Sequence, residues 1–351
     1  MTTQYTLASL GWRASFQQQL SIDEVDHARP ARVLTVQRSG ITVGDTLGER
    51  HIALANKWFS VPAEQRPAIG DWVLLSEHGD AVERVLERTS VFTRVSAGVK
   101  ADLQVIAANV DTLFVVTSCN DEFNPSRLER YLAISLEAGV EPVVILTKAD
   151  LCETADEFVN AVRDVHKTVA IECINALDPV AIEGVRAWCR PGQTIALVGS
   201  SGVGKSTLLN SLAGETKQVT GGIRESDSSG RHTTSHRSLH LLPNGALLLD
   251  SPGMRELKIV DAEQGVTEMF DDVGDLALQC RFNDCVHEDE PGCAVQAAIA
   301  SGVLDERRLL NYRKLLREQA RHTTTIAEQR HRSRQFGKYV KRVVAEKDKR
   351  R

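Results

Sequence analysis

The sequence predicts an α/β fold, and three observations support this prediction. First, from about residue 100 onward short apolar runs alternate with segments of helical spacing, which is typical of a parallel sheet covered by helices. Second, the apolar, β-branched run Thr194–Val198 leads into a glycine-rich turn and then into a helical segment. Third, residues 31–93 contain about five short β-like runs broken by turn residues, which indicates a separate small β-domain.

The N-terminal third is predicted to hold an arm followed by a small barrel. Residues 1–30 are polar and mixed, so we expect an arm or an irregular lead-in there. The close spacing of the strands that follow favours an OB-like β-barrel over residues 31–99, a fold that often binds RNA. A barrel that only packs against its neighbour is the alternative. The candidate strands are Ala31–Val36, Ser39–Val43, His51–Leu54, Gly70–Leu75 and Ala81–Leu86.

Residues 100–262 predict a doubly wound α/β domain. Asn124 and Pro125 are suited to cap and to begin a helix, and Gly139 is suited to end it. Pro243-Asn244-Gly245 separates two apolar runs, which is a hairpin signal. The expected strands are Asp111–Ser118, Glu141–Leu146, Val169–Ile174, Thr194–Val198, Ser238–Leu242 and Ala246–Leu249, and further helices are expected over Thr154–His166 and Ala181–Cys189.

The residues after the Thr194–Val198 strand fit the phosphate-loop pattern GxxxxGK[ST] in its strand–turn–helix context. Glycines let backbone N–H groups turn toward a phosphate, and the N-terminus of the next helix adds partial positive charge. Lys205 offers a charge to the β- and γ-phosphates, and the Ser206 hydroxyl is a ligand for Mg²⁺. A glycine-rich turn with a chance lysine is the alternative. The predicted nucleotide-binding loop comprises Gly199, Ser200, Ser201, Gly202, Val203, Gly204, Lys205, Ser206 and Thr207.

A second nucleotide motif, DSPG at 250–253, follows a buried strand. Asp250 at the carboxyl end of that strand is expected to hold Mg²⁺ through water, and the Gly253 N–H is expected to donate to a γ-phosphate. Between the two motifs, GRHTT at 230–234 has the composition of a switch loop, with a plain flexible loop as the alternative. Thr234, with Thr233 as the alternative, is the expected second Mg²⁺ hydroxyl.

The motif TKAD at 147–150 ends another buried strand and predicts recognition of a base. The Asp150 carboxylate can accept two hydrogen bonds from the N1–H and N2–H₂ edge of guanine, which adenine does not offer. Lys148 is expected along the base plane. Thr147 stands where the usual guanine-reading motif has Asn, so one hydrogen-bonding arm is shorter. After a further strand, Asn175-Ala176 can direct the Ala176 N–H to guanine O6.

The order of these motifs is unusual. A typical small GTPase has the phosphate loop first and the guanine-reading motif last, whereas here residues 147–150 precede residues 199–206. The sequence therefore predicts a circularly permuted P-loop GTPase core. Many GTPases place a glutamine after DxxG to orient water, and the corresponding residue here is Met254. Together with Lys205 and Thr234, His232 is the catalytic candidate, with an exposed loop histidine as the alternative.

Three of the seven cysteines cluster with a histidine in the spacing C-x₄-C-x-H-x₅-C. Three thiolates and one imidazole form the closed tetrahedral shell of a structural zinc site, and a chance cluster of unmetallated thiols is the alternative. An odd total of cysteines without a secretory signal argues against a disulfide framework. Over residues 263–351 we expect a zinc-binding module and a basic helical tail. The predicted ligands are Cys280, Cys285, His287 and Cys293.

The charge distribution sets the tail apart. The chain has a net charge of −5, but residues 305–351 contain 16 Lys/Arg and 6 Asp/Glu, a net of +10 that leaves −15 for residues 1–304. A basic tail indicates nucleic-acid contact, and a solvated tail without a partner is the alternative. Because no signal peptide and no run near the roughly 18 apolar residues of a membrane helix is evident, we expect a cytoplasmic protein without membrane association.

Taken together, these motifs resemble the RsgA (YjeQ) family, bacterial GTPases that act in late maturation of the small ribosomal subunit. The resemblance covers nearly the whole chain: the barrel, the permuted core, GRHTT, DSPG and the zinc spacing. It implies a monomer that binds the small subunit and its rRNA, hydrolyses GTP to GDP with stimulation by the subunit, and carries one structural Zn²⁺ and Mg²⁺ with GTP. Other assembly factors are further expected partners, and His232 is the implied catalytic histidine.

Two other functions stay open. One is a permuted GTPase that acts on the large subunit or on another RNA, although the zinc spacing and the barrel speak against it. The other is an RNA-binding scaffold that holds GTP without hydrolysing it.

Overall fold

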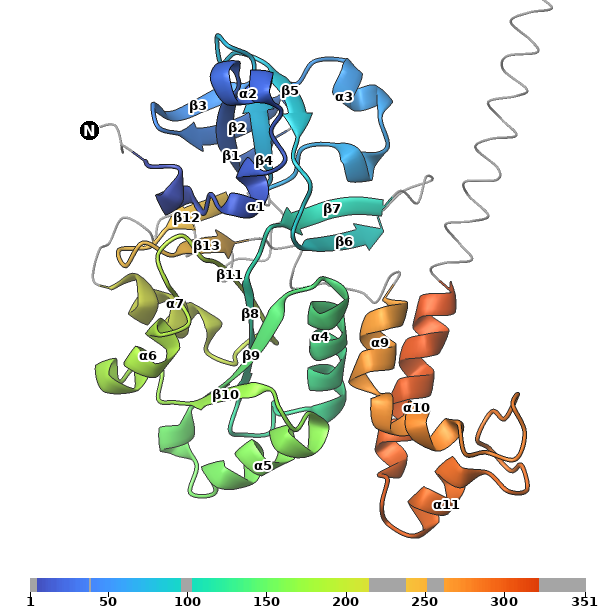
Figure 1. Cartoon of the computed structure of the whole chain (residues 1–351). Coiled ribbons are helices and arrows are strands. Elements are labelled where there is room, and N and C mark those ends of the chain that lie inside the picture. Colours follow the sequence, from blue (N-terminus) through green and yellow to red (C-terminus); the bar gives the residue numbers. More distant parts are fainter. Residues whose placement is uncertain (1–4, 38, 96–102, 215–237, 251–261, 322–351) are drawn as a thin grey trace, which may run out of the picture.

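The computed structural model describes residues 5–37, 39–95, 103–214, 238–250 and 262–321. An N-terminal β-rich unit, a central α/β sheet and a helical C-terminal module follow one another along the chain (Figure 1). Within these ranges, no helix combines the length and the apolar composition needed to cross a membrane. The predicted fold class is confirmed.

A mainly parallel sheet forms the centre of the molecule. Its strands lie in the order β10-β9-β8-β11-β13-β12, and every neighbouring pair is parallel except β12 with β13. Parallel neighbours need crossover connections, and the helices between the strands supply them. The strands are β8 (Thr112–Ser118), β9 (Glu141–Thr147), β10 (Ala170–Cys173), β11 (Thr194–Val198), β12 (Ser238–Leu241) and β13 (Leu247–Asp250).

Helices cover both faces of this sheet, as the sequence predicts. Val115 belongs to the same apolar cluster as Leu132 of α4 on one face, whereas its neighbour Phe114 belongs to the cluster of Ile182 of α6 and Leu208 of α7 on the other. Adjacent strand residues point to opposite faces, so the near-continuous apolar runs of the sequence serve both cores. The helices are α4 (Pro125–Glu137), α5 (Ala155–Val165), α6 (Pro179–Arg186) and α7 (Lys205–Ala213).

Five short antiparallel strands form the N-terminal unit at the positions expected for the barrel. The pairs are β1 with β2, β2 with β3, β1 with β4 and β4 with β5. Strand β1 also pairs with β12 through Thr35 and Ser238, so the ladder runs on into the central sheet, a connection that was not predicted. The strands are β1 (Arg29–Gln37), β2 (Gly40–Asp45), β3 (Gly48–Ile52), β4 (Trp72–Leu75) and β5 (Val82–Val85), with the short helix α3 (Lys57–Ser60) between β3 and β4.

Two connecting regions differ from expectation. A separate hairpin, β6 (Val91–Val95) with β7 (Leu103–Ala108), joins the N-terminal unit to the central sheet. Where an irregular lead-in was expected, the chain forms the short helices η1 (Ala8–Leu10), α1 (Ala14–Gln17) and α2 (Ile22–His27).

Burial of two residues explains why this N-terminal stretch is ordered. Leu10 and Phe16 are almost fully buried, and the rings of Phe16 and Trp72 lie 5.9 Å apart. Arg32 of β1 is buried as well, and its guanidinium donates to the Leu10 carbonyl oxygen at 2.9 Å and to Thr194 Oγ1 at 3.1 Å. A buried charge needs such partners, so Arg32 ties the lead-in to the strand that carries the phosphate loop.

The C-terminal module consists of α9 (Glu263–Met269), α10 (Asp271–Ala277), α11 (Ala294–Ala300) and a helical segment over residues 306–321. Figure 1 shows α9 beside α4, and the last helix beside α9. The approach of α9 to α4 is close, because a Cβ at Gly265 would lie 2.1 Å from the Ala133 carbonyl oxygen. Gly265 N also donates to Glu137 Oε2 of α4 at 2.7 Å.

Buried charges hold the last helix against α4. The Glu129 carboxylate is fully buried and accepts hydrogen bonds from Arg307 at 3.1 Å, from Arg308 at 3.2 Å and from Asn311. Arg308 in turn forms a bidentate pair with Asp272, with N–O distances of 2.6 and 2.8 Å. Breaking one partner of such a buried network leaves the remaining charges uncompensated, so the docking depends on the complete set.

We therefore expect Glu129→Gln to lower the free energy of unfolding by about 3 kcal/mol, since a neutral amide would face the buried guanidinium group of Arg308 and the partly exposed one of Arg307. Urea denaturation of the full chain measures the change. The matched control is Glu183→Gln, whose carboxylate is 64% exposed in an ion pair with Arg186, and a loss below about 0.5 kcal/mol is expected there. Equal shifts for the two variants would contradict a stabilising role of the buried network.

Candidate nucleotide site and Cys₃His cluster

The predicted phosphate loop connects β11 to α7, and its backbone has the positive φ angles that glycine permits. Gly199 has φ +148° and Gly204 has φ +91°. A Cβ at Gly199 would lie 2.2 Å from the Val116 carbonyl oxygen of β8, so only glycine fits there. Lys205 starts α7, and its Nζ donates to the Gly199 carbonyl oxygen at 3.0 Å and to that of Ser200. The loop carbonyls thus orient the ammonium group.

Thr147 joins the two chain segments that the permutation separates. Its side chain is fully buried, and Oγ1 lies 2.6 Å from the Val203 carbonyl oxygen of the phosphate loop and 3.1 Å from that of Thr117. A single hydroxyl proton serves these two acceptors, and the shorter distance favours Val203. The first residue of TKAD therefore lies directly against the phosphate loop, 56 residues away in sequence.

The other predicted base-reading residues lie in two segments, one directly after Thr147 and one after β10. Lys148 has φ +60°, and Asp150 lies in the short helix η3 (Ala149–Leu151) that begins directly after it. The Asn175 side chain accepts the Leu177 N–H at 2.9 Å, and Ser211 Oγ of α7 donates to the Ala176 carbonyl oxygen at 2.7 Å. Both predicted base-reading segments are thus hydrogen-bonded to the phosphate loop or to the helix that follows it.

Asp250 is the last residue of β13, which runs parallel to β11 and beside it. Because parallel strands end at the same edge, Asp250 lies at the edge of the sheet where the phosphate loop begins. Gly253, His232, Thr233 and Thr234 lie outside the described residues, as does Met254.

One contact at this site was not predicted. Arg127, in the first turn of α4, donates through Nη1 to the Ser200 hydroxyl of the phosphate loop. The residues around Arg127 in the sequence do not predict this contact, because Arg127 and Ser200 are 73 residues apart. The signal that could have found it is topological: α4 follows β8, and β8 pairs with β11, so both strand ends open onto the same edge.

The four predicted metal ligands come together, with their donor atoms all within 4.8 Å of one another. Cys280 Sγ lies 3.8 Å from Cys293 Sγ, and each of these sulfurs lies 3.5 Å from His287 Nδ1. A tetrahedral zinc site with ordinary bond lengths has edges of about 3.8 Å between sulfurs and about 3.6 Å between sulfur and nitrogen. Composition and distances are therefore compatible with zinc.

Local structure explains how this cluster is arranged. Cys280 follows α10, and Cys293 caps α11, accepting the Gln296 N–H at 3.4 Å. His287 has φ +59°, and its carbonyl oxygen accepts from Gln296 Nε2 at 2.6 Å. Burial lowers the pKa of the His287 imidazole, which favours the neutral ring that binds metals.

The cysteines outside the cluster are free thiols. Two of them lie close together near the base-reading loops, with Cys119 Sγ 4.0 Å from Cys173 Sγ. Burial raises the pKa of Cys119 to about 12, so this thiol stays protonated and is a poor nucleophile.

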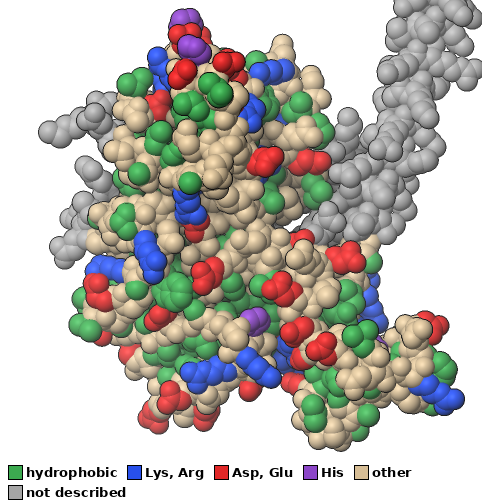
Figure 2. All heavy atoms as spheres, viewed as in Figure 1, with side chains coloured by type: hydrophobic (Ala, Val, Ile, Leu, Met, Phe, Trp, Pro, Cys, Tyr) green, Lys and Arg blue, Asp and Glu red, His purple; other side chains and the backbone are tan. Residues whose placement is uncertain are grey.

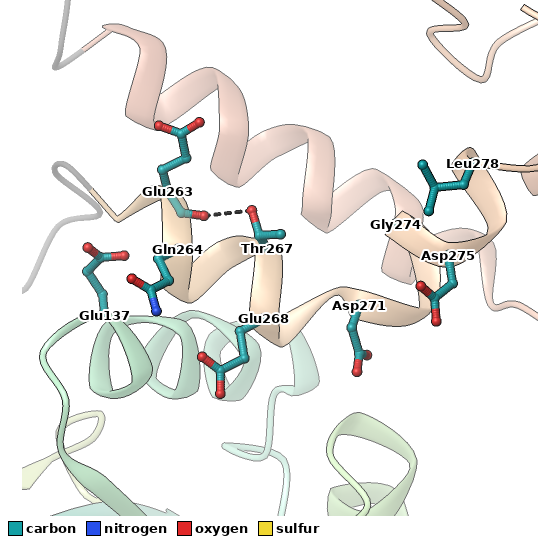
Figure 3. Close-up of a pocket in the computed structure, with 9 residues that line it drawn as sticks. All are labelled: Glu137, Glu263, Gln264, Thr267, Glu268, Asp271, Gly274, Asp275 and Leu278. Atoms are coloured by element: carbon teal, nitrogen blue, oxygen red, sulfur yellow. Dashed lines mark hydrogen bonds between the residues drawn. The ribbon is translucent and has the colours of Figure 1, made fainter. Parts of the chain in front are cut away.

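A groove of about 950 Å³ lies elsewhere, between α4, α9 and α10 (Figure 3). Five carboxylates line it, and their charge would repel a nucleotide triphosphate, so we assign the nucleotide to the phosphate loop. On the face shown in Figure 2, side chains of both charge signs are interspersed. The groove carboxylates belong to Glu137, Glu263, Glu268, Asp271 and Asp275.

A parallel sheet with a phosphate loop, and with the TKAD strand earlier in the chain but adjacent to that loop in space, defines a circularly permuted P-loop GTPase. The RsgA GTPase family model matches residues 85–260. This match, together with relatives that are at least 44% identical over more than 90% of the chain, shows that the chain belongs to the RsgA GTPase family, as the sequence predicts.

The relatives match over nearly the whole chain. "Small ribosomal subunit biogenesis GTPase RsgA 2" of Vibrio vulnificus (strain CMCP6) is 50% identical over 98% of this chain and 97% of its own length. "Small ribosomal subunit biogenesis GTPase RsgA" of Mesorhizobium japonicum is 44% identical over 91% of each chain. An ABC transporter model also matches residues 182–343, a span that includes the phosphate loop, which both classes of protein contain.

Solved structures share the architecture. YjeQ from Thermotoga maritima aligns with a TM-score of 0.61 at 26% identity, covering 83% of this chain and 98% of that chain. YloQ, a circularly permuted GTPase, aligns with a TM-score of 0.56 over 86% of this chain and 96% of that chain, and at 21% identity it supports the fold alone.

Removing the Thr147 hydroxyl should weaken nucleotide binding. Thr147→Val keeps the shape of the side chain but leaves the Val203 carbonyl without its buried donor, at a cost of about 1–3 kcal/mol. We expect about tenfold weaker binding of a fluorescent GDP analogue, measured by titration. Thr147→Ser, which retains the hydroxyl, is the control and should bind nearly as the wild type does. An unchanged affinity in Thr147→Val would show that the loop does not depend on this bond.

Proposed function

We propose that this protein hydrolyses GTP to GDP and phosphate during late maturation of the small ribosomal subunit, and that the subunit stimulates the reaction. The observation that carries the proposal is the contact of Thr147 with the phosphate loop, because it assembles one nucleotide site from two segments in permuted order. The names of the full-length relatives support the ribosomal role.

In this proposal, the phosphate loop from Gly199 to Thr207 binds the phosphates through backbone N–H groups. Lys205, already oriented by two loop carbonyls, offers its ammonium charge to the β- and γ-phosphates. Its role is to neutralise charge that develops on the transferred group, which is the main source of catalysis in this class of reaction.

The base is read at the other end of the site. Asp150 accepts from the guanine N1–H and N2–H₂ edge, and Lys148 lies along the ring plane. Asn175 and Ala176 complete the base pocket, with the Ala176 N–H directed to O6. Thr147 belongs to the same motif, but its hydroxyl is engaged by Val203 and Thr117, so it acts through the position of the phosphate loop.

GTPases of this kind use Mg²⁺ with GTP, where the ion neutralises phosphate charge. Ser206 and Asp250 are its proposed ligands here, with Thr234 as the second hydroxyl and Thr233 as the alternative. Gly253 would donate its N–H to the γ-phosphate. His232 is the proposed residue that orients the attacking water, because Met254 lacks a polar group for that purpose.

The Cys₃His cluster is proposed to hold one structural zinc ion, through Cys280, Cys285, His287 and Cys293. Four protein ligands leave no open position, so the ion would stabilise the module and take no part in hydrolysis. The support is the tetrahedral match of the distances between donor atoms.

The proposed organisation assigns residues 31–99 to an RNA-binding OB-like barrel, 100–262 to the permuted GTPase domain and 263–351 to the zinc module with its basic tail. Residues 1–30, expected as an arm, precede the barrel, and their described part packs against β1 and β4 through Leu10 and Phe16. Phosphates of the subunit's rRNA would attract the tail, 10 of whose 16 Lys/Arg belong to residues 322–351. We further propose a cytoplasmic monomer that meets other assembly factors on the subunit. Action on the large subunit or another RNA, and a scaffold that does not hydrolyse GTP, are the competing functions.

Phosphate release from GTP, measured alone, with purified small subunits and with purified large subunits, tests the function. We expect slow release by the protein alone and strong stimulation by small subunits only. His232→Ala should lower the stimulated rate by about 100-fold, the effect of removing a group that positions or deprotonates water. Stimulation by large subunits would favour the first competing function, and no release under any condition would favour the scaffold.

Asp150→Asn should change the base preference. Loss of a carboxylate that accepts two hydrogen bonds is expected to weaken GTP binding by about 100-fold and to admit xanthosine triphosphate, whose base presents an oxygen where guanine has N2–H₂. Competition titrations with the two triphosphates measure the switch. Asp156→Asn, at an exposed position of α5, is the control and should keep the wild-type preference. Unaltered selectivity in Asp150→Asn would remove the base-reading assignment.

Cys285→Ser should abolish stoichiometric zinc binding, because a serine hydroxyl is a poor zinc ligand. Elemental analysis of purified protein is expected to give one zinc per wild-type chain and well below one for the variant. Limited proteolysis should then cut the variant within residues 278–293, since metal binding supplies folding energy to such a segment. Cys152→Ser, outside the cluster, is the control and should retain its zinc. A metal-free wild type would refute the zinc assignment.

A further inference from the structure

Local contacts fix the backbone position of Arg127. The Asn124 side chain caps α4 by accepting the Arg127 N–H at 2.9 Å, and Pro125 begins the helix. Just before the cap, Phe123 packs edge-on against Phe158 of α5, with ring centroids 5.3 Å apart. The helix cap and the packing of Phe123 thus hold the first turn of α4 in place, and with it the Cα of Arg127.

From that point the guanidinium reaches the phosphate loop. Nη1 of Arg127 donates to the Ser200 hydroxyl, and the Ser200 carbonyl oxygen accepts from Lys205 Nζ. Ser200 therefore accepts a hydrogen bond from the Arg127 guanidinium through its hydroxyl and one from the Lys205 ammonium through its carbonyl oxygen. Since Lys205 is also held by the Gly199 carbonyl at 3.0 Å, a shift of Ser200 would move one of the two groups that orient the lysine.

Helix stability does not account for an arginine at this position. A cation near a helix N-terminus interacts unfavourably with the helix dipole, by about 0.3–1 kcal/mol. The first turn of α4, all of whose residues are described, contains no acidic residue to offset this unfavourable interaction. Among the described residues, Glu122 forms an ion pair with Arg127, with 4.0 Å between Oε2 and Nη1. The Arg127 side chain is 40% exposed and that of Glu122 is 52% exposed. Such a pair contributes little.

Electrostatics point to an anionic ligand. Arg127 and Lys205 bring two positive charges to the same loop residue, and these charges repel each other. A nucleotide polyphosphate would convert this repulsion into attraction for both. Arginine suits the position because Nη1 donates to the serine hydroxyl and the guanidinium keeps its charge at any physiological pH.

We propose that Arg127 is a positioning residue for the nucleotide: it holds Ser200 and thereby the carbonyl oxygen that orients Lys205. The inference rests on the proposed GTP site and adds to it a residue from α4, outside the nucleotide-binding motifs. It applies to GDP and GTP alike, because both use the same phosphate loop.

Titration with fluorescent GDP and with a fluorescent non-hydrolysable GTP analogue tests the inference. Arg127→Met removes the donor and the charge but keeps the apolar stem, and we expect about three- to tenfold weaker binding of both nucleotides. Arg127→Lys should recover part of the loss, because its ammonium group is again a donor for the Ser200 hydroxyl, although on a shorter side chain without the guanidinium geometry. The thermal midpoint of the nucleotide-free Arg127→Met protein should be unchanged or slightly higher, since a dipole-opposed cation is removed.

A double-mutant cycle with Ser200→Ala identifies the route. If Arg127 acts through the Ser200 hydroxyl, Arg127→Met should have little further effect in the Ser200→Ala background. Arg163→Met, the same change at an exposed position of α5, is the matched control and should bind both nucleotides as the wild type does.

Undiminished affinity in Arg127→Met would overturn the inference, and so would an equal loss in the presence and absence of the Ser200 hydroxyl. Both results presuppose a wild type that binds guanine nucleotides. A wild type that holds neither nucleotide would instead overturn the proposed function, and the inference with it.

Discussion

Everything at the nucleotide site depends on the parallel pairing of β8 with β9 and with β11. This pairing brings the carboxyl ends of three strands to one edge, although the chain visits them in permuted order. At that edge the buried Thr147 hydroxyl meets the Val203 carbonyl oxygen, so the end of β9 and the phosphate loop share one hydrogen bond. Because neither group has access to water, the bond constrains the two segments to move together.

Helix α4 connects this edge to the C-terminal module. Its first turn contacts the phosphate loop through Arg127, and two residues later Glu129 accepts hydrogen bonds from Arg307 and Arg308. Buried ion pairs of this kind add little net stability, but they tolerate few alternative arrangements, because any unpaired member is costly. The Cys₃His cluster is therefore attached to the GTPase core through a defined interface and not only through the covalent chain.

Most of the central fold could be predicted, because its strands are apolar runs and its helices carry strong start signals such as Asn124-Pro125. That the four residues of the Cys₃His cluster come together could be predicted from their spacing alone. The β6–β7 hairpin and the short helices before residue 28 could not be predicted. The short helices are held in place by residues far away in the sequence. Phe16 is buried against Trp72, and Leu10 offers its carbonyl to Arg32, neither of which is visible in a local pattern.

The sequence by itself determined the class of the protein, because glycines, Lys205 and a carboxylate at set spacings are required by phosphate and base chemistry wherever they stand in the chain. It also determined the permuted order. Only the tertiary structure decided which way individual side chains point: Thr147 toward the phosphate loop, Arg127 onto Ser200, and Glu129 into the C-terminal module. Those choices depend on contacts between residues more than 50 positions apart, and the free energy of such contacts has no local signature.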